Sequence, residues 1–141
     1  MNRRELLIGA GLALTATARA LADKPTMSPA AAAAARLAGV AAAASHCVPV
    51  ARACLNHCLE MFAGGNASMS GCARAVMDLA PAVEALAAIA STPSRHAAPL
   101  AKVVAEIAKD CKAECDKHLA MGPCKACADS CAALLAEIAK I

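Results

Sequence analysis

Apolar residues recur at helical spacing along four segments of the chain, and clusters of Gly, Pro, Asn and Ser separate these segments. The pattern predicts helices over residues 29–62, 70–90, 99–119 and 122–141. The first helix has clear limits, because Ser28 is a favourable N-cap, Pro29 suits the first helical position and Gly64-Gly65 is a strong stop. Residues that favour strands are too few for a β-protein. The fold class is therefore all-α.

Two prolines, Pro49 and Pro81, lie inside the expected helices. A proline in a helix interior removes one backbone hydrogen bond and crowds the preceding turn. Pro49 therefore predicts that the first helix is kinked, or divided at Ser45 so that a short N-terminal helix precedes the bundle. Pro81 predicts a local bend in the second helix. Short connections favour antiparallel neighbours, so the expected architecture is an antiparallel, up-down-up-down four-helix bundle.

The start of the chain has the features of an export signal. Arg3-Arg4 precedes an apolar run over residues 6–18, and Ala20-Leu21-Ala22 offers a small-residue cleavage site. The paired arginines resemble a twin-arginine signal. The apolar run is shorter than the roughly 20 residues that span a bilayer. We therefore expect an exported, periplasmic protein in which the signal, residues 1–22, is removed, residues 23–141 form the bundle and no membrane segment remains.

The charge and aromatic content of the chain exclude several functions. Loss of the signal removes three arginines and one glutamate, so the formal net charge falls from +3 to +1. Phe62 is the sole aromatic residue, and no basic cluster accompanies it. Neither phosphate contacts nor base stacking has a source, so nucleic acid is not an expected partner. The chain has no Ser/His/Asp, paired-carboxylate or Gly-rich phosphate-binding arrangement, so we do not expect an enzyme.

Nine cysteines are unusual in so short a chain. A rotation of about 100° per residue places them on the apolar face of each helix. On the third helix they continue a stripe of Leu100, Val104 and Ile107, and on the fourth they share a side with Leu135 and Ile138. The nine are Cys47, Cys54, Cys58, Cys72, Cys111, Cys115, Cys124, Cys127 and Cys131. An antiparallel bundle brings them together in one half of its interior, and Leu, Val, Ile and Ala close the other half.

Three pairs of cysteines are spaced four residues apart, at Cys54 and Cys58, Cys111 and Cys115, and Cys127 and Cys131. Residues at this spacing on a helix have Cβ atoms roughly 5–6 Å apart, whereas a disulfide requires about 3.5–4.5 Å. Such pairs are poor disulfides but suit a soft metal held by two thiolates, and many thiolates with thioether neighbours favour Cu(I). The sequence therefore predicts that several Cu(I) ions bind in the core.

Other readings of the cysteines remain open. They could be buried free thiols, although nine on aligned stripes exceed what packing requires. A disulfide framework would suit an exported protein, but the helical spacing and the odd number oppose it. Cys124 and Cys127 form a Cys-x-x-Cys pair that two further cysteines could complete as a structural zinc site. The same pair could be a thiol-redox motif at a helix N-terminus, without the β-α-β context that such enzymes use.

Histidine and methionine residues cluster near the same end of the expected bundle. His57 and Met61 are one turn apart, and Met69 precedes the second helix, so all three should flank the cysteines and could pass Cu(I) inward. The alternative for Met61 and Met69 is packing in the apolar core. Met121 and His118 belong to the same end. We expect the two other histidines, His46 and His96, to be ordinary surface residues.

The residues resemble those of the exported bacterial copper storage proteins, which are cysteine-lined four-helix bundles. The matching segments are Ser45-His46-Cys47, Cys54-Leu55-Asn56-His57-Cys58-Leu59-Glu60-Met61, Asn66-Ala67-Ser68-Met69 followed by Cys72, Ala101-Lys102-Val103-Val104, Cys111-Lys112-Ala113-Glu114-Cys115-Asp116-Lys117 and Ala126-Cys127. The resemblance implies homotetramers and entry of Cu(I) through an end where His57, Met61 and Met69 occupy the matching positions. The chain has fewer cysteines than the best-known exported members, and Gly64 stands where the family pattern has a further methionine. We therefore expect a reduced capacity.

Overall fold

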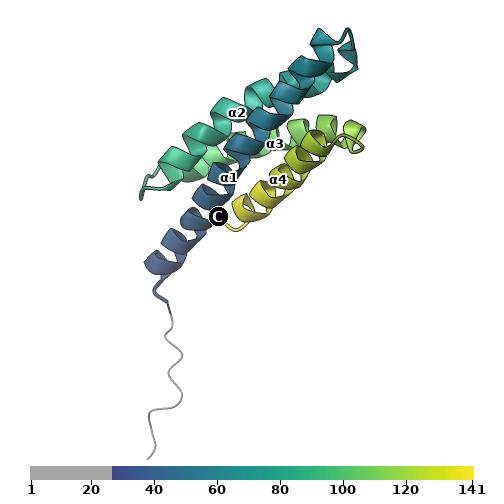
Figure 1. The fold of residues 1–141 in the computed structure, drawn as a ribbon. Helices are drawn as coiled ribbons and strands as arrows, with labels where there is room; N and C mark the ends of the chain where they lie inside the picture. Colours follow the sequence, from purple (N-terminus) through teal and green to yellow (C-terminus); the bar gives the residue numbers. More distant parts are fainter. Residues whose placement is uncertain (1–26) are drawn as a thin grey trace, which may run out of the picture.

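The computed structural model describes residues 27–141, and the expected signal, residues 1–22, lies outside this range. Four α-helices make up the fold (Figure 1): α1 (Pro29–Ala63), α2 (Ser70–Ala90), α3 (Ala97–Cys115) and α4 (Gly122–Ile138). A short 3₁₀ turn, η1 (Ala67–Met69), precedes α2, and another, η2 (Asp116–His118), follows α3. Residues 27–141 contain no strand, so the prediction of an all-α protein is confirmed.

The helix ends follow the local sequence signals. The Ser28 hydroxyl caps α1 by accepting a hydrogen bond from the Ala31 N–H at 3.2 Å. Beyond α1 the chain turns at Gly65, whose φ of 80° is a conformation that favours glycine. The predicted limits of α2 are those observed. α3 begins at Ala97, two residues before the predicted start at Pro99, and its last expected turn is the 3₁₀ turn η2.

Pro49 lies inside an uninterrupted α1 of 35 residues. The expected division at Ser45, with a separate short N-terminal helix, is therefore wrong. Both Ser45 and Pro49 are exposed, whereas Ala44 and Cys47 before the proline and Ala51 after it are buried. Packing of this continuous buried face against the neighbouring helices offsets the one backbone hydrogen bond that the proline removes.

Each helix packs against two others. α1 contacts α2 and α4, and α3 contacts the same two helices, so the four form a closed ring around a shared core. α1 is the longest, and its N-terminal turns extend past the ends of the other helices (Figure 1). An ion pair between Arg52 and Glu84 joins α1 to α2 on the surface. Such an exposed pair contributes at most about 1 kcal/mol, so burial of apolar and thiol side chains holds the ring together.

The buried stripes differ from the predicted ones on two helices. On α3, Leu100 and Ile107 are only half-buried, while the alanines beside them on the helix face, Ala101 and Ala108, are fully buried. On α4, Leu134 is fully buried and the expected Leu135 is half-buried. On α3 the interior takes two alanines in place of the larger Leu100 and Ile107, whereas on α4 it takes one leucine in place of its neighbour. The size of the apolar side chain therefore does not decide which position is buried; the space left by the neighbouring helices does.

One of the described helices, α1, is long and apolar enough to cross a membrane by length and composition alone. The core helix of a water-soluble protein can meet the same criterion. α1 also contributes buried residues to the ring, including three cysteines. Its hydropathy therefore does not assign it a membrane position.

Candidate metal centre

The structure places all nine cysteines in the interior of the helix ring. Each has 0% of its surface exposed, and each is a free thiol. α1 contributes Cys47, Cys54 and Cys58, α2 contributes Cys72, α3 contributes Cys111 and Cys115, and α4 contributes Cys124, Cys127 and Cys131. The prediction that these side chains face the core is confirmed.

Sulfur atoms from different helices lie in van der Waals contact. Cys54 Sγ of α1 lies 3.7 Å from Cys72 Sγ of α2 and 4.0 Å from Cys115 Sγ of α3. The sulfurs of Cys72 and Cys115 are 3.6 Å apart, which closes a triangle across three helices. Cys111 Sγ and Cys127 Sγ, on α3 and α4, lie 3.9 Å apart. The contact between Cys54 and Cys115 thus joins residues 61 positions apart in the chain.

Besides this triangle, three groups of three sulfurs, which we call the triads, have all their sulfurs within 4.8 Å of one another. They are Cys54/Cys58/Cys72, Cys54/Cys115/Cys127 and Cys111/Cys127/Cys131. The triads share Cys54 and Cys127, so they form a continuous chain of sulfurs rather than three separate sites. The remaining cysteines, Cys47 and Cys124, lie near this chain, because Cys131 is the main cause of the lowered pKa of Cys47, and Cys54 and Cys72 act on the pKa of Cys124.

The sulfur spacing suits metal ions of low coordination number. With a metal–sulfur bond of about 2.3 Å, three sulfurs around one ion in a trigonal arrangement lie about 4.0 Å apart. The observed contacts of 3.6–4.0 Å are close to this value. A closed zinc site uses four ligands, whereas each triad has three.

The thiols differ in their readiness to ionise. Hydrogen bonds donated by Cys111 and Cys115 lower the pKa of Cys127 to about 5. Cys54 instead donates hydrogen bonds to Cys115 and Cys127, and these bonds are the main cause of its raised pKa. Burial raises the pKa of Cys58, Cys72 and Cys124, and hydrogen bonds to Cys115 and Cys127 raise that of Cys111. At neutral pH the thiols with a raised pKa are therefore protonated, and a metal ion that binds them must displace protons.

The expected histidine and methionine residues have different environments. Met69 is fully buried, while Met61 is half-buried at the end of α1. His57 is also half-buried, and its Nε2 atom is buried without a hydrogen-bond partner among residues 27–141. An unpaired buried nitrogen costs about 1–3 kcal/mol. This nitrogen is therefore available to a metal ion that approaches this side of α1.

Other histidine and methionine residues, outside the expected set of copper ligands, also differ in exposure. Met121 and His118 are half-buried, whereas His46 and His96 are exposed, as expected for surface residues.

Ser130 is a site residue that the sequence analysis did not identify. It is the one buried polar side chain in the described range, with 8% of its surface exposed. Hydrogen bonds from Cys131 and, to a smaller extent, from Ser130 lower the pKa of Cys47. Its position three residues after Cys127, on the face that carries the cysteines of α4, is the sequence signal that could have indicated this role.

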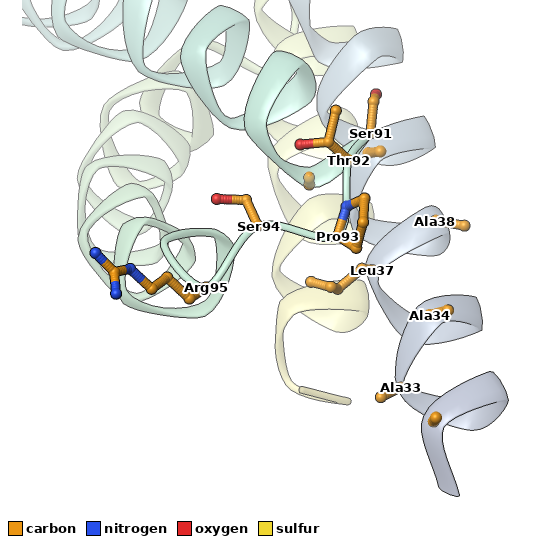
Figure 2. A pocket seen from close by; sticks show the side chains of 12 residues that line it. Ala33, Ala34, Leu37, Ala38, Ser91, Thr92, Pro93, Ser94 and Arg95 are labelled. Carbon is orange, nitrogen blue, oxygen red and sulfur yellow. The ribbon is translucent and has the colours of Figure 1, made fainter. Parts of the chain in front are cut away.

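A groove of about 880 Å³ lies elsewhere, between the start of α1 and the connection from α2 to α3. Figure 2 shows Ala33, Ala34, Leu37 and Ala38 of α1 opposite residues 91–95 of this connection. Its lining is largely apolar and includes no cysteine, histidine or carboxylate. The groove therefore lacks the ligands that a metal centre requires.

Comparison with known families agrees with the cysteine cluster. The family model for copper storage protein matches residues 33–141. The chain belongs to the copper storage protein family. The match spans α1 from its second turn to the end of the chain, and it includes every cysteine. A comparison with curated proteins gives no match.

Membership of the family fixes the broad function of the cluster. The resemblance expected from the cysteine-containing segments is confirmed, and copper is the metal that the family implies. The triads provide groups of soft ligands that suit copper. The family also suggests storage rather than catalysis.

Proposed function

We propose that this protein binds and stores several Cu(I) ions through the thiolates that line an antiparallel, up-and-down four-helix bundle. The observation that carries the proposal is the continuous chain of sulfurs formed by the triads. Soft thiolates at low coordination number favour Cu(I) over hard cations. Shared sulfurs can bridge neighbouring ions, so an odd number of cysteines is no obstacle. We expect at least three ions, one for each triad.

Contacts between cysteines support the alternating direction of the helices. Cys54 of α1 lies beside Cys127 of α4, and Cys47, two turns earlier on α1, lies beside Cys131, one turn later on α4. Opposite progress along the two helices is the signature of antiparallel neighbours. The contact of Cys72, at the start of α2, with Cys115, at the end of α3, supports the same arrangement for that pair.

His57, Met61 and Met69 form the proposed entrance for Cu(I). His57 and Met61 are one turn apart on α1 and lie on either side of Cys58, a member of the first triad. The buried Nε2 of His57 has no partner in the described part of the chain, so it can accept a cation without breaking a hydrogen bond. Imidazole and thioether groups are neutral, soft ligands that can pass Cu(I) to thiolates.

We also propose that the protein is exported. The twin-arginine-type segment, residues 1–22, would direct the protein to the periplasm and be removed there. The proposed mature protein is a homotetramer of bundles, by resemblance to the exported members of the family. Mass spectrometry of the protein from a periplasmic fraction would test the cleavage, and light scattering would test the tetramer. Retention of the signal in the cytoplasm would overturn the first, and a monomer the second.

Titration of the reduced, metal-free protein with Cu(I) in competition with a chromogenic chelator tests the central proposal. The expected result is tight binding of three or more ions per chain. A stoichiometry of one or less would refute storage. Tight binding of two zinc ions with little copper would instead favour a structural zinc protein, and catalytic disulfide exchange with a substrate would favour the thiol-redox alternative.

A further inference from the structure

A groove of about 350 Å³ runs between α1 and α4 on the side of the bundle, away from the proposed entrance. Its lining residues are Ala43, His46 and Val50 of α1 and Ala126, Asp129, Ser130 and Ala133 of α4. It is separate from the apolar groove of Figure 2, which involves the start of α1 and the connection after α2. We call it the lateral groove.

The lateral groove lies directly over the thiols that are farthest from the entrance. His46 and Ser130 immediately precede Cys47 and Cys131 in the chain, and Cys131 is the main cause of the lowered pKa of Cys47. Ser130 lines the groove and contributes to the same lowering of the Cys47 pKa, so its side chain lies near this thiol. Ser130 therefore lies between the groove and the thiol of Cys47. Cys47 is 11 residues before Cys58 on α1, a separation of about 16 Å along the helix.

The chemistry of the groove suits the passage of a soft cation. His46 is exposed at its rim and provides an imidazole. The carboxylate of Asp129 lies in the same lining and forms an ion pair with Lys125 at 2.6 Å. Ala126 and Ala133 offer only methyl groups to the lining, so little side-chain volume covers the helix seam.

We propose that the lateral groove is a second passage for Cu(I), through which ions reach Cys47 and Cys131 without crossing the His57 end. The inference rests on the proposed storage of Cu(I). His46 takes the ion first, and a rotation of the Ser130 side chain admits it to the thiols. The ion keeps its oxidation state throughout. A thiolate of the carrier that delivers Cu(I) is released and takes up the proton that the receiving thiol loses, so charge and protons balance.

The order in which thiols become protected from alkylation tests this passage. The reduced protein is mixed with a substoichiometric amount of Cu(I) bound to a small thiol, and the free cysteines are alkylated after short intervals under denaturing conditions. Mass spectrometry then reports the protection of each cysteine. In the unaltered protein, protection of Cys47 and Cys131 is expected as early as that of Cys58, which lies nearer the entrance.

Filling the lateral groove should delay these deep thiols alone. Ala126→Leu with Ala133→Leu changes two exposed positions in the lining, whereas Ala132→Leu alters an exposed alanine of α4 outside it and is the matched control. The expected effect is about tenfold slower protection of Cys47, which corresponds to a barrier raised by about 1.4 kcal/mol. Protection of Cys58 and the final copper stoichiometry should not change.

A second pair of variants keeps the test independent of how well the leucines are accommodated. His46→Ala should also slow protection of Cys47, and His96→Ala, at an exposed histidine outside the groove, should not. If neither the leucine pair nor His46→Ala changes the kinetics at Cys47, the lateral passage is refuted even when the full number of ions binds. Failure of copper to bind at all would refute the proposed storage function instead.

Discussion

Two double variants that retain equal numbers of thiols test whether copper capacity depends on the triads or on the number of cysteines. Cys54 and Cys127 are the shared sulfurs, so Cys54→Ser with Cys127→Ser breaks all three triads. Cys47 and Cys124 belong to none, so Cys47→Ser with Cys124→Ser leaves all three complete. Serine is close to cysteine in size, but its hydroxyl is a hard and weak ligand for Cu(I).

The expected capacities follow from the sulfur positions. The first variant retains no group of three sulfurs from the original set, so it should lose the three or more tightly bound ions and keep only weak binding at pairs of thiols. The second should retain at least three tight ions. Mass spectrometry of the copper-loaded proteins and competition with a Cu(I) chelator measure both quantities. Equal losses of capacity in the two variants would refute the idea that triads, rather than the number of thiols, set the capacity.

The stability of the metal-free variants must be measured in the same experiment. Each buried serine hydroxyl that lacks a partner costs about 1–3 kcal/mol, and both variants carry two substitutions at fully buried positions. Thermal unfolding followed by circular dichroism would show whether each remains helical at the titration temperature. The comparison is valid for folded proteins with similar melting temperatures, because the two variants then differ in the arrangement of their thiols and not in overall order.

Four further predictions follow from the core. Burial raises the pKa of Cys58 and Cys72 above 9.0, so above that pH the unfolded chain binds fewer protons than the native one. The free energy of unfolding should therefore fall by about 1.4 kcal/mol per pH unit for each such thiol. Denaturant unfolding at several pH values measures this decrease. Loading with Cu(I) at pH 7 should release protons into weakly buffered solution, whereas release of none would contradict protonated thiols. His57→Ala should slow loading without reducing capacity, and stopped-flow mixing with His96→Ala as control measures this. Leu79→Ala should lower the free energy of unfolding by about 2–5 kcal/mol and leave copper capacity unchanged, because Leu79 is fully buried outside the triads.

Much of the fold could be predicted because local signals and helical periodicity agree. The predicted limits of α2 match, and the burial of every cysteine followed from rotation around single helices. The sequence left open whether the helix is kinked at Pro49 or divided at Ser45, and the absence of a division depends on packing by other helices. The choice of Ala101 over Leu100 for the interior could not be predicted, because it depends on the space left at the centre of the ring.

The arrangement of the thiols required the structure for a different reason. Periodicity places a residue on a helix face, but contacts between helices depend on their relative rotation and axial offset. The triad of Cys54, Cys115 and Cys127 combines three helices and therefore has no signature in any one segment. Ser130 was missed because a serine on an apolar stripe is not distinctive until Cys47 is placed beside it.

Sharing of Cys54 and Cys127 has a consequence for how a population of molecules fills with copper. In the proposed store, the first ion to enter a triad would deprotonate a sulfur that also belongs to the next triad, so the second ion would find a thiolate already formed and its neighbours already oriented. Successive ions would then bind more readily than the first. At intermediate copper supply the population should divide into nearly empty and nearly full molecules, and the protein would respond to a threshold concentration of free copper rather than in proportion to it.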